Sequence, residues 1–125
     1  MKKVLYTLFI IMCVTIVASC GKGHDAKGHV KKFMTEQMGL DDYDVIAWSN
    51  IDSTSHVKDS MLQVMHQTSL KDKLVKKGTT YQPRTEKLNL ITVRYKIDND
   101  TLTSTFYLDD KLSGIVGVKG DGIKK

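Results

Sequence analysis

The sequence predicts a small α+β domain with two layers, in which helices pack on one face of a roughly four-stranded, curved antiparallel sheet. Apolar side chains recur at helical spacing in residues 24–38 and 56–77, and they alternate with polar side chains in residues 86–97 and 101–118. Clusters of Asp, Asn, Gly and Thr separate these segments. Helices followed by a meander of strands are typical of this class.

The first helix is expected over residues 24–38, with Gly39 just beyond its carboxyl end. A strand is expected from Tyr43 to Ile51, where β-branched and aromatic residues alternate loosely. Val57, Met61, Val64 and Met65 share one helical face, whereas Leu70 and Leu74 fall on the opposite one. This change of phase, with a capping box at Ser69–Asp72, predicts two helices, residues 56–67 and 70–77.

A hairpin is expected where a strand over residues 86–97 meets the turn Asp98-Asn99-Asp100-Thr101. A two-residue loop at Asn99–Asp100 gives one inner face and one wet face. The predicted pairs are Ile97 with Leu102, Tyr95 with Ser104, Val93 with Phe106, Ile91 with Leu108, Arg94 with Thr105 and Lys96 with Thr103. A three-residue loop, residues 109–111, then places a third strand whose inner face carries Leu112, Gly114, Val116 and Val118.

The amino-terminal segment has the character of a secretory signal. Lys2 and Lys3 precede an apolar run that ends in the small residues Ala18 and Ser19. A helix needs about 20 apolar residues to cross a membrane, and residues 4–19 are fewer than that. We therefore expect a cleaved signal peptide rather than a spanning anchor.

The end of this segment, Val17-Ala18-Ser19-Cys20, resembles the lipobox of bacterial lipoproteins. In that family the cysteine is diacylated, the signal is cut just before it, and the new amino terminus is acylated. The resemblance implies lipidation of Cys20, for example with palmitate; an ordinary signal peptide ending near a cysteine is the alternative. Two or more acyl chains hold a protein stably on a membrane. We expect a lipid anchor in the cell membrane or outer membrane of a Gram-negative bacterium, with the protein facing the periplasm.

Removal of residues 1–19 leaves 125 − 19 = 106 residues, which is enough for one domain. The expected division is a signal peptide (1–19), a lipidated tether (20–25), one α+β domain (26–119) and a flexible tail (120–125). With Cys20 lipidated, no thiol is left for a disulfide or a metal. The remaining 17 basic and 14 acidic side chains give a net charge of 17 − 14 = +3. This mild charge and the exported location argue against a nucleic-acid partner.

The order of elements is similar to that of the cystatin-like and nuclear-transport-factor-2-like (NTF2-like) folds. In such a fold a pocket forms between helix and sheet, and the small residues Ser104 and Gly114 leave room there. This resemblance makes Trp48, Tyr95 and Phe106 the candidate ligand-binding residues; a filled aromatic core is the alternative.

The sequence contains no motif of a serine hydrolase, zinc protease or phosphate-binding loop, so we expect neither a catalytic set nor a cofactor. The histidine spacings do not converge on a metal from one helix, so no metal site is expected. The segments Asp52-Ser-Thr, Asp59-Ser-Met and Asp100-Thr-Leu resemble the Asp-Ser/Thr-apolar acceptor of periplasmic O-glycosylation in some Gram-negative bacteria, which makes Ser53, Ser60 and Thr101 candidate acceptor residues.

Three functions stay open. The first is a membrane-anchored, non-catalytic binding or interaction domain. The second is a small-ligand carrier or degenerate enzyme with an NTF2-like pocket. The third is a structural accessory subunit that contacts a protein partner in the cell envelope.

Overall fold

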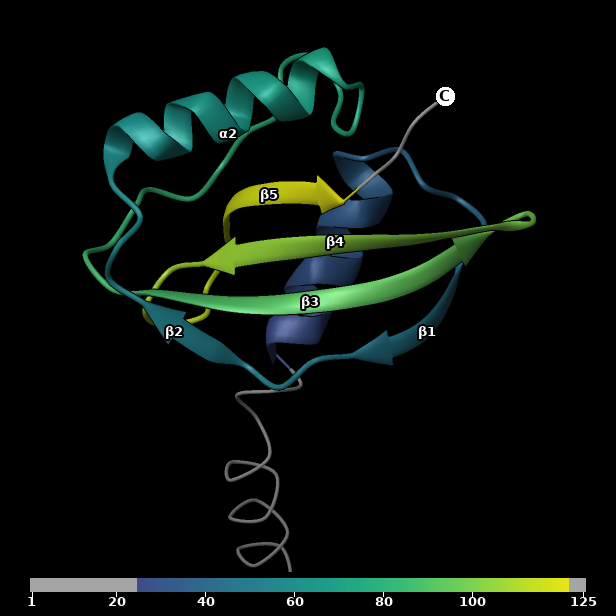
Figure 1. The fold of residues 1–125 in the computed structure, drawn as a ribbon, viewed down its shortest axis with the longest axis horizontal. Helices are drawn as coiled ribbons and strands as arrows, with labels where there is room; N and C mark the ends of the chain where they lie inside the picture. Colours follow the sequence, from purple (N-terminus) through teal and green to yellow (C-terminus); the bar gives the residue numbers. More distant parts are fainter. Residues whose placement is uncertain (1–24, 122–125) are drawn as a thin grey trace, which may run out of the picture.

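The fold is given by a computed structural model that describes residues 25–121 (Figure 1). A helix over residues 25–36 comes first. The other elements are β1 Asp44–Trp48, β2 Asp52–Thr54, α2 Asp59–Lys71, β3 Leu88–Ile97, β4 Asp100–Leu108 and β5 Ile115–Asp121. The strands form one antiparallel sheet in the order β1-β3-β4-β5, and β2 also pairs with β3. The α+β class is therefore confirmed.

The sheet has five strands because the strand expected over residues 43–51 is confined to β1, and a short strand that was not expected, β2, follows it. The interruption lies at Ser49, whose N–H donates to the Thr92 carbonyl and whose hydroxyl oxygen accepts the Thr92 N–H. β1 also carries a register irregularity between Val45 and Ala47. Strand β3 therefore pairs with two short strands, β1 and β2, along the same edge.

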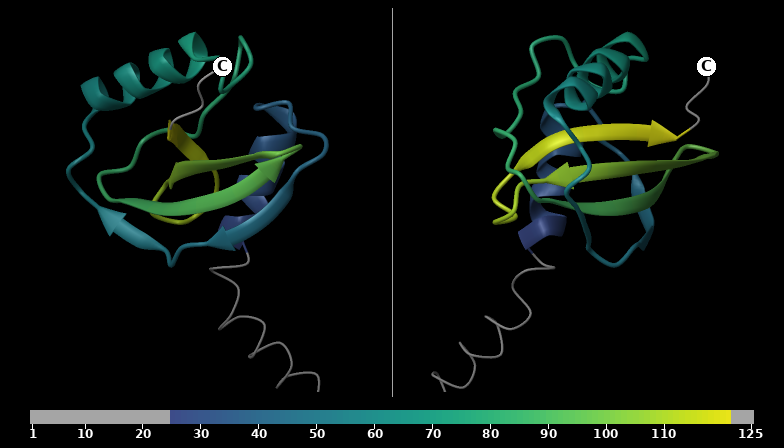
Figure 2. Two further views of the ribbon diagram at one scale, coloured as in Figure 1. Left: turned by 45° about the vertical axis from the view of Figure 1, so that its right-hand side comes forward. Right: turned by 60° about the vertical axis from the view of Figure 1, so that its left-hand side comes forward.

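The first helix packs on one face of the sheet, as Figures 1 and 2 show. Ala26, Val30, Phe33 and Met34 are buried against side chains of β3, β4 and β5. The helix ends where expected, since Gly39 has a φ of 69° and the Leu40 N–H donates to the Met34 carbonyl. The main core lies between this helix and the sheet.

The prediction of two helices in residues 56–77 is wrong, because a single helix, α2, runs through the expected break. Ser69 is not a cap: its hydroxyl donates to the Val118 carbonyl. The helix stops after Lys71, and Lys73 takes a φ of 58° while the Leu74 N–H donates to the Ser69 carbonyl. Leu70 and Leu74 were expected on the face opposite to Met61 and Val64. Leu70 is exposed there, whereas the left-handed turn at Lys73 directs Leu74 into the main core.

The β3–β4 hairpin has the expected faces but a register two residues away from the predicted one. The loop is Asp98–Asn99, so Ile97 pairs with Asp100 and Tyr95 with Leu102. A φ of 54° at Asp98 places the two-residue turn one position earlier than predicted. A shift of two residues leaves every side chain on its original side of the sheet, so Ile91, Val93, Tyr95 and Phe106 still face the core.

Strand β5 begins later than expected, at Ile115, and runs to Asp121. A register irregularity between Tyr107 and Leu108 turns the start of the strand. Val118 therefore lies in the main core, whereas Val116 packs in a second cluster with Val57, Leu62 and Leu88. The prediction that Val116 and Val118 share one face is wrong for this reason.

Helix α2 runs along the outer edge of β5 (Figure 2). His66 Nε2 lies 2.8 Å from the Val116 carbonyl oxygen, to which it donates, and Ser69 Oγ donates to the Val118 carbonyl over 2.7 Å. The Gln82 N–H donates to the Ile115 carbonyl. These groups occupy carbonyls that an edge strand would otherwise offer to another chain.

Residues 25–121 contain both hydrophobic clusters and pair each described strand with its neighbour, so this part of the chain forms a self-contained fold. None of the helices within it has the length and apolar character that crossing a membrane would require.

Candidate functional site

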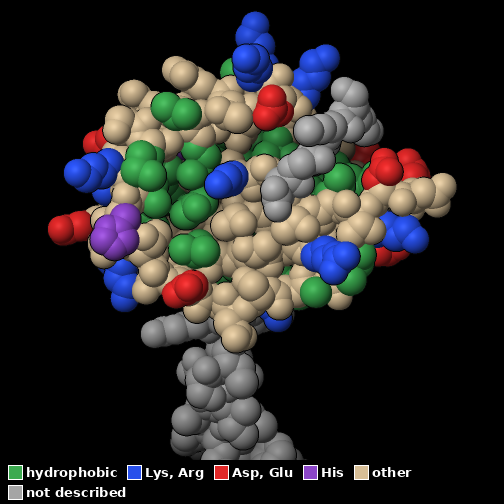
Figure 3. Space-filling view, in the orientation of Figure 1, with side chains coloured by type: hydrophobic (Ala, Val, Ile, Leu, Met, Phe, Trp, Pro, Cys, Tyr) green, Lys and Arg blue, Asp and Glu red, His purple; other side chains and the backbone are tan. Residues whose placement is uncertain are grey.

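A groove of about 600 Å³ opens between α2 and the outer part of β4 and β5. Figure 3 shows hydrophobic side chains gathered in a hollow beneath α2, with basic side chains near it. Its volume is within the range of about 300–1,000 Å³ that is usual for small-molecule sites. The lining residues are Val57, Met61, Val64, Met65, Thr68, Ser69, Asp72, Leu74, Tyr107, Val118, Lys119 and Gly120.

One wall of the groove is an apolar stripe on α2. Met61, Val64 and Met65 follow one another at helical spacing and turn to the same side. Met61 is 50% exposed and Val64 is 62% exposed, although both are large apolar side chains. Adjacent exposed apolar side chains at the rim of a hollow indicate a surface that binds something.

The floor of the groove is formed by strands β4 and β5. Tyr107 of β4 is half-buried beside Met65 and the second hydrophobic cluster, and it pairs with Gly117 of β5. A Cβ atom on Gly117 would lie 2.8 Å from Met65 Sδ and 3.2 Å from Leu62 Cδ2. The absence of a side chain there lets α2 lie close to the sheet and sets the depth of the groove.

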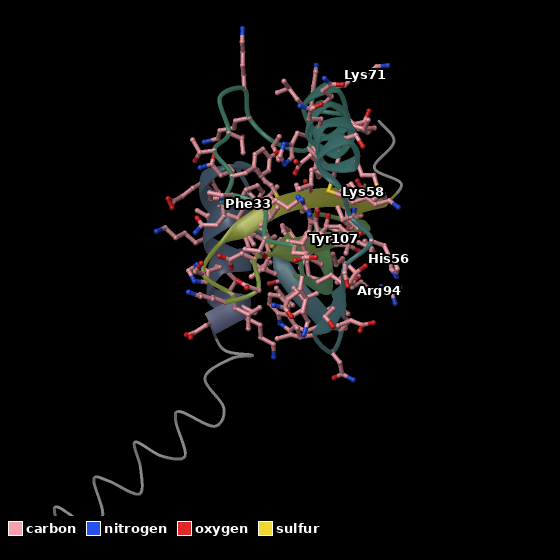
Figure 4. The ribbon with its side chains drawn as sticks, turned by 90° about the vertical axis from the view of Figure 1, so that its left-hand side faces the viewer. Phe33, His56, Lys58, Lys71, Arg94 and Tyr107 are labelled. Atoms are coloured by element: carbon pink, nitrogen blue, oxygen red, sulfur yellow. The ribbon has the colours of Figure 1, made fainter. Side chains whose placement is uncertain are left out.

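Figure 4 places Tyr107 below α2, with Lys58 and Arg94 on the same side of the molecule and Phe33 on the side of the first helix. Lys58 is the N-cap residue of α2, and Lys71 stands in its last turn. The two ends of the helix that forms the wall therefore each carry a lysine.

The groove is apolar at one end and polar at the other. Helix α2 and strand β5 run in the same direction, since Leu62 and Met65 approach Gly117 while Leu74 approaches Gly120. The apolar end has Val57, Met61 and Tyr107. The other end has the polar side chains Thr68, Asp72 and Lys119 together with the apolar Leu74. A ligand with the same division of polarity would match it.

The three aromatic residues predicted to bind a ligand do not line this groove. Tyr95 and Phe106 are fully buried in the main core, and Tyr95 Oη is hydrogen-bonded to Ser104 Oγ at 3.0 Å. Trp48 is half-buried at the edge of that core, with the Lys27 ammonium 5.6 Å from its ring. The space between helix and sheet that they were expected to border is occupied by core side chains such as Val30 and Met34.

The predicted acceptor residues for glycosylation, Ser53 in β2, Ser60 in α2 and Thr101 in β4, are all exposed. Exposure is a requirement for modification, and the modification itself stays a prediction. Cys20, the predicted lipidation site, lies outside the described residues.

Two smaller hollows, of about 280 Å³ and 290 Å³, are both lined by Tyr81. The ring of Tyr81 stacks on that of His66, with the ring centroids 3.8 Å apart. Its hydroxyl is buried and has no hydrogen-bond partner among the described residues. Burial raises the pKa of Tyr81. Among residues 25–121, no group of three or more His, Cys, Asp or Glu side chains is placed to hold a metal ion.

The sequence contains the signal for the groove, since Val57, Met61, Val64 and Met65 share one helical face. Periodicity identifies an apolar stripe but does not say how much of it the rest of the chain covers.

Comparison with known proteins gives no match to a family model, to a curated protein or to a solved structure.

Proposed function

We propose that this chain is a lipid-anchored, exported binding domain without catalytic activity, and that it holds a small apolar ligand in the groove beneath α2. The groove is the observation that carries the binding part of the proposal. It combines a volume of about 600 Å³ with the exposed apolar side chains of Met61 and Val64. The lipobox resemblance at Val17-Ala18-Ser19-Cys20 supports the anchoring part.

The position of the groove suits a tethered domain. The groove lies beside α2 and β5. The described chain begins at residue 25, at the start of the first helix, which lies away from α2 (Figure 1). The groove and the anchored end are thus on different elements. A ligand could enter while the chain is held at its amino terminus.

The anchor is tested by the Cys20→Ala variant of the full-length protein in a Gram-negative host. We expect the wild-type protein to sediment with membranes, to take up labelled palmitate, and to be processed in a globomycin-sensitive way. We expect the variant to lose all three properties. A variant that was still processed and still membrane-bound would refute the lipid anchor.

The groove is tested with N-phenyl-1-naphthylamine, an uncharged apolar fluorophore, added to residues 21–125. We expect binding, and we expect Val64→Asp to weaken it by about tenfold or more, since a carboxylate at the rim replaces apolar contact. Gln63→Asp is the matched control, because Gln63 is exposed on the same helix and does not line the groove. Failure of the wild-type domain to bind the probe, or equal binding by both variants, would refute a ligand site in the groove.

A further inference from the structure

The geometry points to a specific class of ligand for this groove: a single-chain amphiphile with an anionic head group, such as a fatty acid. The inference rests on the proposed function, because it assumes that the groove is a ligand site. The apolar chain would lie along α2, and the head group would lie at the end marked by Lys119.

The shape of the groove favours an extended apolar chain over a compact ligand. The lining residues of α2 and its N-terminal flank run from Val57 to Asp72, which corresponds to about 20 Å along a helix. Along this length the wall changes from Met61 and Val64 to Thr68 and Asp72. A ligand that is apolar for most of its length and polar at one end fits this sequence of contacts.

The methionines make the wall adaptable. Met61 and Met65 have unbranched, flexible side chains, and such residues adjust to apolar ligands of different length. A fatty acyl chain is itself flexible. The apolar half of the groove therefore suits apolar chains in general rather than one particular molecule.

The charge at the polar end favours an anionic head group. Lys119 pairs with Thr105 of β4 and lines the groove, and Asp72, which also lines it, is flanked in the chain by Lys71 and Lys73. These three lysines outnumber Asp72, the acidic residue among the described residues that line this end of the groove. A carboxylate head would pair with Lys119 while the chain stays on the apolar side.

The test is displacement of N-phenyl-1-naphthylamine from residues 21–125 by decanoate, dodecanoate and dodecanol. We expect dodecanoate to bind about tenfold more tightly than decanoate, because two more methylene groups leave water. We expect dodecanoate to bind about two- to fivefold more tightly than dodecanol, because its carboxylate forms an exposed ion pair with Lys119 and the alcohol does not.

Lys119→Gln should remove the preference for dodecanoate over dodecanol and leave dodecanol binding unchanged. Lys111→Gln is the control, since Lys111 is exposed and does not line the groove. Thermal unfolding monitored by circular dichroism verifies that each variant is folded.

Three results would overturn the inference: equal displacement by dodecanoate and dodecanol, a carboxylate preference that survives Lys119→Gln, or a fluorophore that binds at Val64 and resists displacement by every chain. In each case binding of the fluorophore would still support the proposed function. If the fluorophore itself did not bind, the proposed function would fail first.

Discussion

The hydroxyl of Ser69 donates a hydrogen bond of 2.7 Å to the carbonyl oxygen of Val118, and so joins the middle of the chain to its last strand. Both partners are buried. Together with His66 and the Val116 carbonyl, this contact holds α2 against the edge of β5. The groove exists because these side chains fix α2 beside the sheet rather than across it.

Ser69→Ala should lower the free energy of unfolding by about 1–3 kcal/mol, because it leaves the buried Val118 carbonyl without a partner. Urea unfolding measures the change. Ser60→Ala on the exposed first turn of the same helix should change stability by no more than about 0.5 kcal/mol. Equal effects of the two substitutions would show that the Ser69 bond does not hold α2 in place.

Gly117→Ala should destabilise the fold by about 1–3 kcal/mol, because its Cβ would crowd Met65 Sδ at 2.8 Å. Combining it with Met65→Ala, which removes the crowded atom, should cost less than the sum of the two single substitutions. The comparison is a double-mutant cycle by urea unfolding. Strict additivity would mean that α2 does not pack against β5 at this point.

Lys73→Gly should stabilise the fold by about 0.5–1 kcal/mol, because the exposed Lys73 has a φ of 58°, a conformation that glycine adopts without strain. Lys71→Gly, two residues earlier at the last residue of α2, should destabilise it by up to about 0.5 kcal/mol. Thermal unfolding of the two variants should therefore shift in opposite directions. A shift of the same sign would contradict the left-handed turn after α2.

Stability should fall as the pH rises above about 10. Burial raises the pKa of Tyr81, and burial raises that of Tyr95 too, against a smaller opposite effect of its hydrogen bond to Ser104. The folded state thus holds these protons more tightly than the unfolded state does. The stabilisation is fully present below the usual tyrosine pKa of 10.0 and is lost as the pH passes through the raised values.

Tyr81→Phe tests this pH dependence. At pH 7 it should be neutral or stabilising by up to about 1 kcal/mol, because the buried hydroxyl has no partner among the described residues. It should also reduce the loss of stability between pH 9 and pH 11, measured by urea unfolding. Tyr43→Phe controls for the removal of a hydroxyl from a half-buried tyrosine. If the free energy of unfolding of Tyr81→Phe fell as steeply between pH 9 and pH 11 as that of the wild type, groups other than Tyr81 would cause the loss of stability.

Glycosylation at Ser53, Ser60 or Thr101 should be detectable by peptide mass spectrometry of the protein from its native host. All three residues are exposed, so an attached sugar would not disturb either hydrophobic cluster. Unmodified peptides covering all three positions would refute the prediction.

The first helix and the faces of the hairpin strands were predicted correctly because they follow from local spacing of side chains. The first helix and its end at Gly39 come from apolar residues at helical intervals and a glycine that accepts a positive φ. The faces of β3 and β4 come from alternation. The hairpin register was wrong by two residues because alternation is unchanged by such a shift, and the turn at Asp98 selects between the two.

The sequence by itself determined the α+β class, the first helix, the inner faces of β3 and β4 and the apolar face of α2, since each depends on side-chain periodicity within one segment. The tertiary structure alone decided that α2 is continuous, that Tyr95 and Phe106 are core residues, and that Met61 and Val64 border an open groove. These features depend on contacts between distant segments. The hydrogen bond from Ser69 to Val118 and the close packing of α2 on Gly117 join segments that are far apart in the chain. They form only in the folded sheet, so no local sequence pattern predicts them.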